Sequence, residues 1–370
     1  MNILVLNWRD IEHPEAGGAE VHFIELFSRL VDKGHSVTLL TTRFKDCSQT
    51  AYQRGVEVLR LGHTYTFNWE APFLVRKLLK QKNYDCVIDD VNKLPFFTPL
   101  WFPKVKCGAF FHHLFGKTVF GLTNAPMALY VYLMEKIYSW GYKNVLCCTV
   151  SQSTAAELIG KGFPAQNVSI IENCIDTGLY CPDSKVSKEN GLLLYVGRLK
   201  KYKRVDIVFE AVSVLKKQGY QLRFVVAGSG DDLARLKQRR KELELEDRVE
   251  FTGFISEEKK IELLRRAILF VNPSEKEGWG ITNIEAAACG TVVVANNAPG
   301  LRDSVIDNRT GILYRENDAG SLSSAIKKLI DDKELMEKFG EQGRLWASAF
   351  SWDTSAQRVE NWLQKIVREK

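Results

Sequence analysis

The amino-acid sequence predicts an α/β fold built from two Rossmann-like domains, each with a doubly wound parallel sheet. Its 370 residues are too many for one ordinary hydrophobic core, so two domains of similar size are expected. Short apolar runs alternate with longer segments of helical periodicity, which is typical of parallel sheets covered by helices. This alternation stops in a polar stretch at 177–190 and starts again at Leu192, which indicates two successive units of the same class.

Five strands are expected in each half of the chain. They are 3–7, 36–41, 86–89, 107–111 and 145–150, then 192–196, 222–227, 249–252, 268–271 and 291–295. Apolar residues recur at helical spacing in segments such as 19–33, 205–218 and 232–243. We therefore expect an N-terminal domain at 1–180 and a C-terminal domain at 190–351, with an amphipathic helix at 352–370 that returns to the first domain.

Charge and cysteine content narrow the class of function. Lys and Arg outnumber Asp and Glu by only 51 to 45, which argues against nucleic-acid binding and suits a small acidic ligand. The eight cysteines lie in apolar contexts without a Cys-x-x-Cys pair, so buried, reduced thiols are expected. The N-terminus begins directly in a strand and no uncharged apolar run reaches spanning length, so a cytoplasmic location is expected.

A glycine pair, Gly17-Gly18, lies between the first strand and the first helix. Glycine lets a phosphate approach the backbone closely, and the helix N-terminus offers N–H groups. The loop is longer than a dinucleotide-binding turn and lacks the Gly-x-Gly-x-x-Gly spacing. A plain strand-to-helix turn is the alternative.

A basic segment follows the first strand of the second domain. Arg198 and Lys203 are expected to bind a diphosphate at the carboxyl end of the sheet, where open parallel sheets bind ligands. The other basic residues of the segment, Lys200, Lys201 and Arg204, are expected to be surface charges. The alternative is a solvated basic turn with no ligand.

Glu277 and Glu285 flank a second glycine-containing junction between a strand and a helix. If the helix begins near Thr282 or Asn283, Glu285 falls in its first turn, where its carboxylate could accept hydrogen bonds from a ribose. Glu277 is expected to face the space above the strand ends. The alternative makes Glu285 only a first-turn acid and Glu277 only a loop charge.

Two histidines, His112 and His113, follow the strand expected at 107–111. A histidine pair at a strand end can hydrogen-bond a ligand. The other four histidines are expected to be structural.

Together these motifs resemble the retaining, nucleotide-sugar-dependent glycosyltransferases of family 4, also called glycosyl transferases group 1. The resemblance covers nearly the whole chain in family order, and the glutamate pair in its Gly-x-Gly context is its most specific part. Further matching pieces are Ser151-Gln-Ser153, Glu172-Asn-Cys-Ile-Asp176, Gly228-Ser-Gly230 and Thr252-Gly-Phe254. The chain departs from the family pattern at Cys174, where glycine is usual. The resemblance implies the GT-B architecture, in which two Rossmann-like domains face each other across a cleft.

The resemblance also implies a role for each site. The donor diphosphate would be bound by Arg198, Lys203, Gly17, Gly18, Gly280, Ile281 and Thr282. The ribose and nucleoside would be bound by Glu285, Gly253 and Phe254. The catalytic residues would be Glu277, at the transferred sugar, and His112 and His113, of which His112 is better aligned to position that sugar.

The implied reaction moves a sugar from a nucleoside diphosphate to an acceptor hydroxyl with retention of configuration, and UDP is the commonest nucleotide among similar proteins. Arg198 and Lys203 would stabilise the leaving diphosphate, so no metal and no cofactor besides the sugar nucleotide is expected. The acceptor would attack from the face that the diphosphate leaves, and a covalent intermediate on Glu277 is the less favoured alternative. Three acidic pairs lack Asp-x-Asp spacing and are expected to be caps or surface acids: Asp89-Asp90, Asp231-Asp232 and Asp331-Asp332.

The aromatic residues give the one indication of an acceptor. Between Tyr65 and Tyr142 lie 18 of the chain's 40 aromatic residues. In the segment 69–82, a basic amphipathic helix could present one apolar face formed by Trp69, Phe73, Leu74, Leu78 and Leu79. The hypothesis is peripheral contact with an anionic membrane, at the inner face of the cell membrane, and a lipid-linked or cell-surface glycan precursor as acceptor. The alternative is an ordinary helix packed on the sheet.

Three other functions suit a chain of this shape. A sugar-nucleotide epimerase would release a changed sugar nucleotide without any acceptor. A glycan phosphorylase would need a lysine for pyridoxal phosphate, and none is indicated. A non-catalytic sugar-nucleotide-binding partner subunit is the third, and the presence of Arg198, Lys203, Glu277 and Glu285 argues against it.

Overall fold

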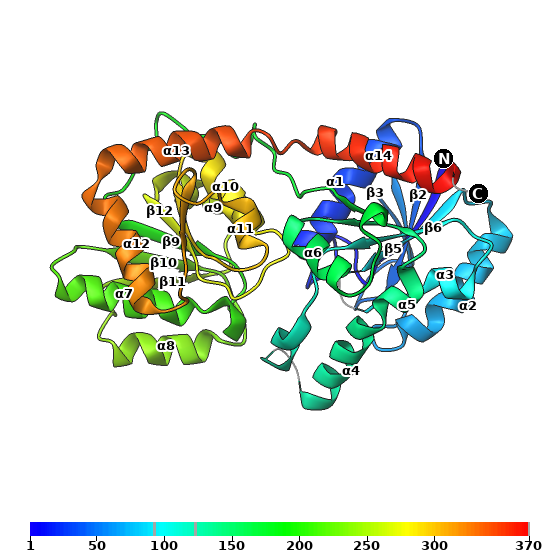
Figure 1. Cartoon of the computed structure of the whole chain (residues 1–370), viewed down its shortest axis with the longest axis horizontal. Coiled ribbons are helices and arrows are strands. Elements are labelled where there is room, and N and C mark those ends of the chain that lie inside the picture. The colour runs from blue at the N-terminus through cyan, green and yellow to red at the C-terminus, as the bar shows by residue number, and fades with distance from the viewer. Residues whose placement is uncertain (92–93, 122–123, 369–370) are drawn as a thin grey trace. The chain divides into compact units, whose positions relative to one another are not determined.

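The computed structural model describes residues 1–91, 94–121 and 124–368. The chain divides into two compact units, Met1–Cys174 with Trp352–Lys370, and Ile175–Ser351 (Figure 1). Each unit contains one sheet that is parallel or nearly so, with helices packed on it. The predicted class, α/β with two Rossmann-like parallel-sheet domains, is confirmed.

The first unit has an eight-stranded sheet in the order β3-β4-β2-β1-β5-β6-β7-β8. Neighbouring strands are parallel except β3 and β4. The strands are β1 (Asn2–Leu6), β2 (Ser36–Thr42), β3 (Thr50–Gln53), β4 (Val56–Gly62), β5 (Cys86–Val91), β6 (Cys107–Phe111), β7 (Leu146–Thr149) and β8 (Val168–Ile170). The five predicted strands are present, and β3, β4 and β8 are additional.

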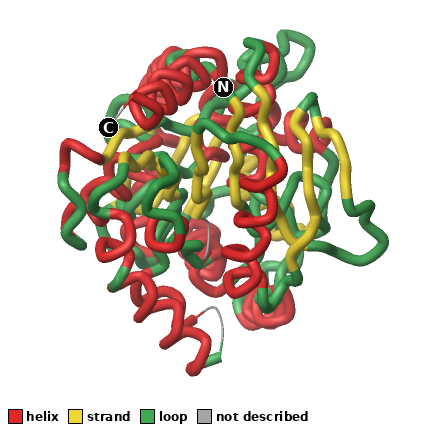
Figure 2. The backbone as a smooth tube through the Cα atoms, turned by 90° about the vertical axis from the view of Figure 1, so that its right-hand side faces the viewer, coloured by secondary structure: helices red, strands yellow, loops and turns green. Residues whose placement is uncertain are grey.

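Helices cover this sheet, as Figure 2 shows from the side of the first unit. They are α1 (Gly18–Asp32), α2 (Phe67–Gln81), α3 (Thr98–Trp101), α4 (Ala125–Lys136), α5 (Tyr138–Tyr142), α6 (Gln152–Gly160) and α14 (Trp352–Arg368), with 3₁₀ segments η1 (Gly116–Gly121) and η2 (Ala165–Asn167). The C-terminal helix α14 lies along α1, where Lys33 Nζ donates to Glu360 Oε2 at 2.8 Å (Figure 1). Helix α14 is therefore part of the first unit.

Helix α2 does not present the single apolar face predicted for 69–82. Its inner side packs into the core through Phe67, Ala71, Val75 and Leu78. On its other side Trp69 and Phe73 are 73% and 76% exposed, because they lie about half a turn away from Leu78 at the helical spacing. Leu74 and Leu79 are partly buried against the core. The predicted single face is therefore wrong: the helix packs on the sheet through other residues and leaves Trp69 and Phe73 exposed. None of the described helices is long and apolar enough to cross a membrane.

The second unit has a six-stranded parallel sheet in the order β11-β10-β9-β12-β13-β14. The strands are β9 (Leu192–Val196), β10 (Arg223–Ala227), β11 (Val249–Gly253), β12 (Leu269–Asn272), β13 (Val292–Asn296) and β14 (Gly311–Tyr314). The helices are α7 (Val205–Lys217), α8 (Leu233–Glu242), α9 (Glu257–Arg266), α10 (Ile281–Ala288), α11 (Leu301–Ser304), α12 (Ala319–Asp331) and α13 (Lys333–Ala347), with the 3₁₀ segment η3 (Lys201–Lys203). The five predicted strands are present, and β14 is additional.

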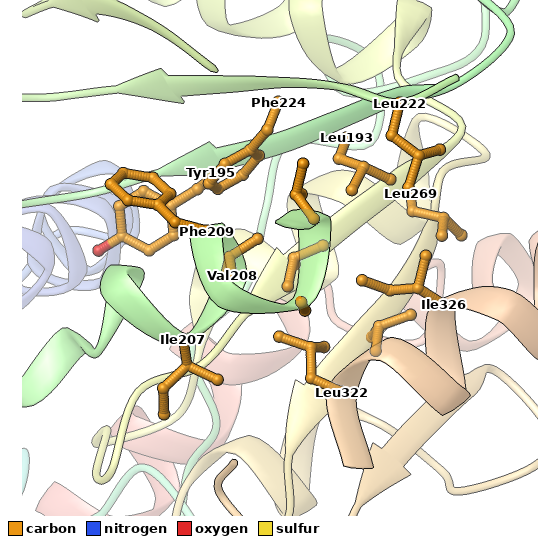
Figure 3. Packing of buried hydrophobic residues seen from close by; sticks show 14 of the residues in the cluster. Leu193, Tyr195, Ile207, Val208, Phe209, Leu222, Phe224, Leu269, Leu322 and Ile326 are labelled. Atoms are coloured by element: carbon orange, nitrogen blue, oxygen red, sulfur yellow. The ribbon is translucent and has the colours of Figure 1, made fainter. Parts of the chain in front are cut away.

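The core of the second unit forms between the sheet and helices α7 and α12 (Figure 3). Val208 and Phe209 of α7 meet Phe224 of β10, and Leu322 of α12 joins the same cluster. Each of these side chains is fully buried, which stabilises the fold by about 1.5–3 kcal/mol per residue. This core holds the carboxyl ends of the strands in fixed positions.

Candidate functional site

The junction from β12 to α10 carries Glu277 before the helix and Glu285 within it. Gly280 precedes the helix with a φ of 81°, a left-handed conformation that favours glycine. A Cβ at Gly280 would also lie 2.8 Å from Ser304 Oγ. The helix begins at Ile281, directly after this turn, so Glu285 lies in its second turn. The prediction of a first-turn position is therefore wrong.

A chain of buried polar side chains holds this junction. Asn272 Nδ2 donates to Asn283 Oδ1 at 3.0 Å, and Asn283 Nδ2 donates to Ser304 Oγ at 2.9 Å. All three side chains are buried, and a satisfied buried network fixes one conformation. Sequence reasoning missed these residues, although an asparagine at the end of β12 and another at the start of α10 are a signal that could have found them.

The structure brings Lys203 and Glu277 together as an ion pair. Their side chains are only 13% and 19% exposed. Burial alone would lower the pKa of Lys203, but the charge of Glu277 raises it above its ordinary value. Lys203, the predicted diphosphate ligand, and Glu277, the predicted sugar ligand, are therefore in direct contact.

Arg198 lies in the turn after β9, and its side chain is exposed. It forms no ion pair within the described part of the chain. By contrast, Lys200 pairs with Asp231 at 2.8 Å and Arg204 pairs with Glu275 at 2.9 Å. These partly exposed ion pairs agree with the prediction that Lys200 and Arg204 are surface charges. The Arg198 guanidinium, at the carboxyl end of β9, is therefore available to bind an anionic ligand.

Glu285 is paired with a lysine that sequence reasoning did not identify. Lys260 Nζ donates to Glu285 Oε1 at 3.1 Å and lies 3.0 Å from Glu257 Oε1. Burial raises the pKa of Glu285, and Lys260 opposes that rise. The second oxygen, Oε2, is buried and has no donor in hydrogen-bonding geometry among the described residues, since the nearby Tyr180 hydroxyl donates to Glu257. Such an oxygen can be satisfied by a ligand hydroxyl.

Gly253 and Phe254 are predicted to bind the nucleoside. Gly253 is the last residue of β11, and Phe254 follows it. Gly253 has a φ of 71°, and its carbonyl oxygen accepts a hydrogen bond from the Gly228 N–H at 2.8 Å. Phe254 is 87% exposed, which leaves its ring free to contact a ligand. The loops after β10 and β11 are thereby joined at the same edge of the sheet.

In the first unit, Gly17 and Gly18 stand at the N-terminus of α1. The Gly17 N–H donates to Glu20 Oε2 at 2.7 Å. Gly18 is exposed, and no atom lies within 4 Å of the place where its Cβ would be. Packing within this unit therefore does not require glycine at position 18, whereas the close approach of a ligand to the helix N-terminus would.

His112 belongs to a buried polar group at the carboxyl edge of the first sheet. Its Nε2 lies 2.6 Å from Asp90 Oδ1, and Asn7 Nδ2 donates to Asp90 Oδ2 at 2.6 Å. Burial alone would lower the pKa of His112, but Asp90 raises it. His113 is half-buried instead, with its ring centre 4.5 Å from that of Phe115. His112 therefore has a buried carboxylate partner in Asp90.

The interpretation of Asp90 as a cap or surface acid is wrong. Adjacent residues of a strand point to opposite faces of the sheet, so Asp89 and Asp90 enter different layers. Asp89 accepts hydrogen bonds from Thr98 and from Tyr142 Oη, and burial raises its pKa to about 6. Asp90 instead reaches His112, because β5 and β6 are neighbours whose carboxyl ends meet.

Two family models match successive parts of the chain. The model of glycosyl transferases group 1 matches residues 182–346, and the model of Glycosyltransferase Family 4 matches residues 16–179. The chain belongs to this glycosyltransferase family. One relative is the phosphatidylinositol N-acetylglucosaminyltransferase gpi3 subunit of Schizosaccharomyces pombe, 26% identical over 97% of this chain and 80% of the relative.

Solved structures with this glycosyltransferase fold include sucrose-phosphate synthase from Thermosynechococcus elongatus. That structure has a TM-score of 0.84 at 21% identity, over 99% of this chain and 98% of the other. The HepE protein of Anabaena, solved with UDP and glucose, has a TM-score of 0.77 at 21% identity, over 99% and 100% of the two chains. These likenesses confirm the GT-B glycosyltransferase fold.

Within the second unit of the glycosyltransferase, the predicted residues gather at one edge of the sheet. Arg198 follows β9, Gly253 ends β11 and Glu277 follows β12. Parallel sheets bind ligands at this carboxyl edge. A separate hollow of about 450 Å³, lined by residues that include Arg223 and Val249, lies at the amino ends of β10 and β11 and takes no part in this arrangement.

Proposed function

We propose that this glycosyltransferase moves a sugar from a nucleoside diphosphate sugar, with UDP as the nucleotide, to an acceptor hydroxyl with retention of anomeric configuration. The observation that carries the proposal is the pairing of Lys203 with Glu277 at the carboxyl edge of the second sheet. Arg198, without an ion pair among the described residues, and Glu285, with a buried oxygen that lacks a donor, support it. UDP is favoured because the HepE relative binds UDP and UDP-glucose.

In the proposed reaction, the bond between the anomeric carbon and the diphosphate oxygen breaks as negative charge grows on the leaving group. Arg198 and Lys203 stabilise that charge, and we propose that these two cations suffice without a metal or a further cofactor. The acceptor oxygen forms the new bond on the face that the diphosphate leaves. The acceptor's proton passes to the leaving phosphate oxygen.

The remaining residues bind and orient the donor. Glu277 contacts the transferred sugar, with Lys203 holding its carboxylate in place, and His112 positions that sugar. Glu285 accepts hydrogen bonds from the ribose through its unsatisfied oxygen. The other proposed contacts are Gly17, Gly18, Gly280, Ile281 and Thr282 with the diphosphate, Gly253 and Phe254 with the nucleoside, and His113 with the sugar.

The proposed acceptor is a lipid-linked or cell-surface glycan precursor, used by a cytoplasmic protein in peripheral contact with an anionic membrane. The Schizosaccharomyces pombe relative supports this choice, because its name specifies phosphatidylinositol, a membrane lipid. That relative is also named as a subunit, which keeps a partner subunit as the second candidate.

The test separates nucleotide binding from transfer. Glu277→Ala is compared with Glu275→Ala, a neighbouring acid that pairs with Arg204 on the surface. A nucleoside diphosphate at 100 times its Kd stabilises a protein by about 2.7 kcal/mol, so UDP should raise the melting temperature of all three proteins. We expect transfer from UDP-sugars to be lost only in Glu277→Ala. Unchanged turnover in that variant would remove Glu277 from the mechanism, and a wild-type chain that binds UDP without any transfer would favour the partner subunit.

A further inference from the structure

Helix α4 is apolar on all sides and yet exposed. Of its residues Ala125–Lys136, only Ala128 and Glu135 are buried. Met127, Leu129, Tyr130 and Leu133 are 40–49% exposed. A helix that is apolar all round is normally buried in a core or in a membrane. Figures 1 and 2 both show α4 projecting from the lower end of the first unit.

The apolar surface continues beyond α4. Helix α4 contacts η1 and α5, and α5 contacts α3. These neighbouring elements also carry exposed apolar side chains, of which Trp140 is the most exposed at 67%. We call the whole set the α4 patch: Leu100, Trp101, Phe120, Met127, Leu129, Tyr130, Leu133, Ile137 and Trp140.

The exposed charges of the segment that carries the α4 patch have one sign. From residue 91 to residue 156 the sequence has six lysines and a single acid, Glu135. Glu135 is 1% exposed, and its carboxylate accepts the N–H groups of Phe115 at 2.5 Å and Gly116 at 2.8 Å. The carboxylate of Glu135 is therefore buried and does not contribute an exposed negative charge to this segment.

Three lysines stand at the margin of the α4 patch. Lys117, Lys136 and Lys143 are exposed, and none of them forms an ion pair with a described residue. The ammonium group of Lys136 lies 4.8 Å from the centre of the Tyr132 ring. The surface that results is apolar and aromatic, with a positive rim and no exposed carboxylate on the described part of 91–156.

We infer that the α4 patch inserts into the headgroup region of an anionic phospholipid bilayer. The inference deepens the proposed membrane contact, on which it rests, by naming the surface that makes it. Twelve helical residues span about 18 Å, which is too short for a hydrocarbon core of about 30 Å, so α4 lies in the interface. Tryptophan and tyrosine prefer that depth, and lysines at the rim attract anionic lipid.

The charge pattern favours a membrane over a second copy of the chain. In a twofold dimer the same surface faces itself, so the lysines of the α4 patch would meet like charges. An anionic bilayer complements both the apolar centre and the positive rim. The occupant is therefore a lipid surface.

The experiment uses the full chain and vesicles of phosphatidylcholine, with or without about 30% phosphatidylglycerol. The test variant carries Leu129→Glu and Leu133→Glu together, and the control is Leu345→Glu, which alters a residue of the second unit that is 61% exposed. We expect sedimentation with anionic vesicles to weaken by at least about tenfold in the double variant only, because charge on the inserting face opposes burial. A blue shift of Trp140 emission on binding, absent in Trp140→Phe, gives a second readout.

Each outcome decides between the occupants. Equal vesicle binding by the wild-type chain and the double variant would overturn the inference. A loss of self-association in sedimentation equilibrium, with vesicle binding unchanged, would assign the α4 patch to a second copy instead. UDP-induced thermal stabilisation is measured in the same proteins. If UDP stabilises none of these proteins but the double variant still loses vesicle binding, the proposed function is wrong and the inference that the α4 patch binds membranes is supported.

Discussion

Asp90 Oδ1 lies 2.6 Å from His112 Nε2 inside the first unit, and both side chains are buried. The second oxygen of Asp90 accepts from Asn7, so the carboxylate is held in one orientation and holds the imidazole in turn. The ring of His22 lies 5.3 Å from that of His112, and burial with the charge of His112 lowers the pKa of His22 well below its usual value. On lowering the pH, His112 is therefore protonated before His22.

Asp90→Asn should lower the pKa of His112, because the carboxylate whose charge and hydrogen bond raise it is lost. In the wild-type protein the Asp90–His112 pair contributes fully to the free energy of unfolding below about pH 6.5, the ordinary pKa of histidine. This contribution is lost as the pH rises through the raised pKa of His112. Titration of the histidine ring protons by NMR measures the pKa.

The resonance of His113, the adjacent histidine, is followed in the same spectra as an internal reference. If transfer depends on protonated His112, the alkaline limb of its pH profile should move to lower pH in Asp90→Asn. An unchanged pKa of His112 would show that Asp90 only packs against the ring.

Lys203→Met should destabilise the second unit by about 2–4 kcal/mol, because it leaves the largely buried Glu277 without its cation. Adding Glu277→Gln should recover part of that loss, because the uncompensated charge is removed. Urea unfolding measures both. Lys200→Met, which breaks an exposed pair with Asp231, is the matched control and should cost less than about 1 kcal/mol.

The strands could be predicted wherever a local apolar run was long enough. The strand at Leu192–Val196 is found with its bounds as expected, because it is fully apolar and is followed directly by Gly197. Strand β8 has three half-buried residues and gives no such run. Strand β4 alternates buried and half-buried residues, but one buried position is taken by Arg60, so the sequence shows no regular alternation of apolar residues there.

The partners of the predicted site residues could not be found from local pattern. Asp90 and His112 are 22 residues apart, and Lys260 and Glu285 are 25 apart. Each pair depends on which strands or helices become neighbours in the fold. Sequence motifs therefore predict candidate ligand-binding residues, while their buried partners are found only in the structure.

Glu285→Gln should weaken UDP binding by about 10- to 100-fold, because a charged hydrogen bond to the ribose is worth about 1.5–3 kcal/mol. The pKa of Glu285 is raised by burial, so the UDP affinity of the wild-type protein should fall as the pH falls through that pKa and the carboxylate is protonated. This pH dependence should be absent in Glu285→Gln. Isothermal titration calorimetry measures the affinity.

Glu258→Gln is the matched control for that series, since Glu258 is exposed at the start of α9. It should leave both the affinity and its pH dependence unchanged. An equal loss of affinity in both variants would point to the surface charge of the unit and not to the ribose contact.

Gly18→Ala should leave the melting temperature unchanged or slightly raised, because open space surrounds the new Cβ and the position begins a helix. It should nevertheless raise the KM for the sugar nucleotide by about tenfold or more if a phosphate approaches this backbone closely. Gly280→Ala is the contrasting variant. Its left-handed φ and its contact with Ser304 should cost about 1–3 kcal/mol in stability. A normal KM in a stable Gly18→Ala protein would remove Gly18 from the diphosphate site, because the structure gives that glycine no role in packing within its own unit.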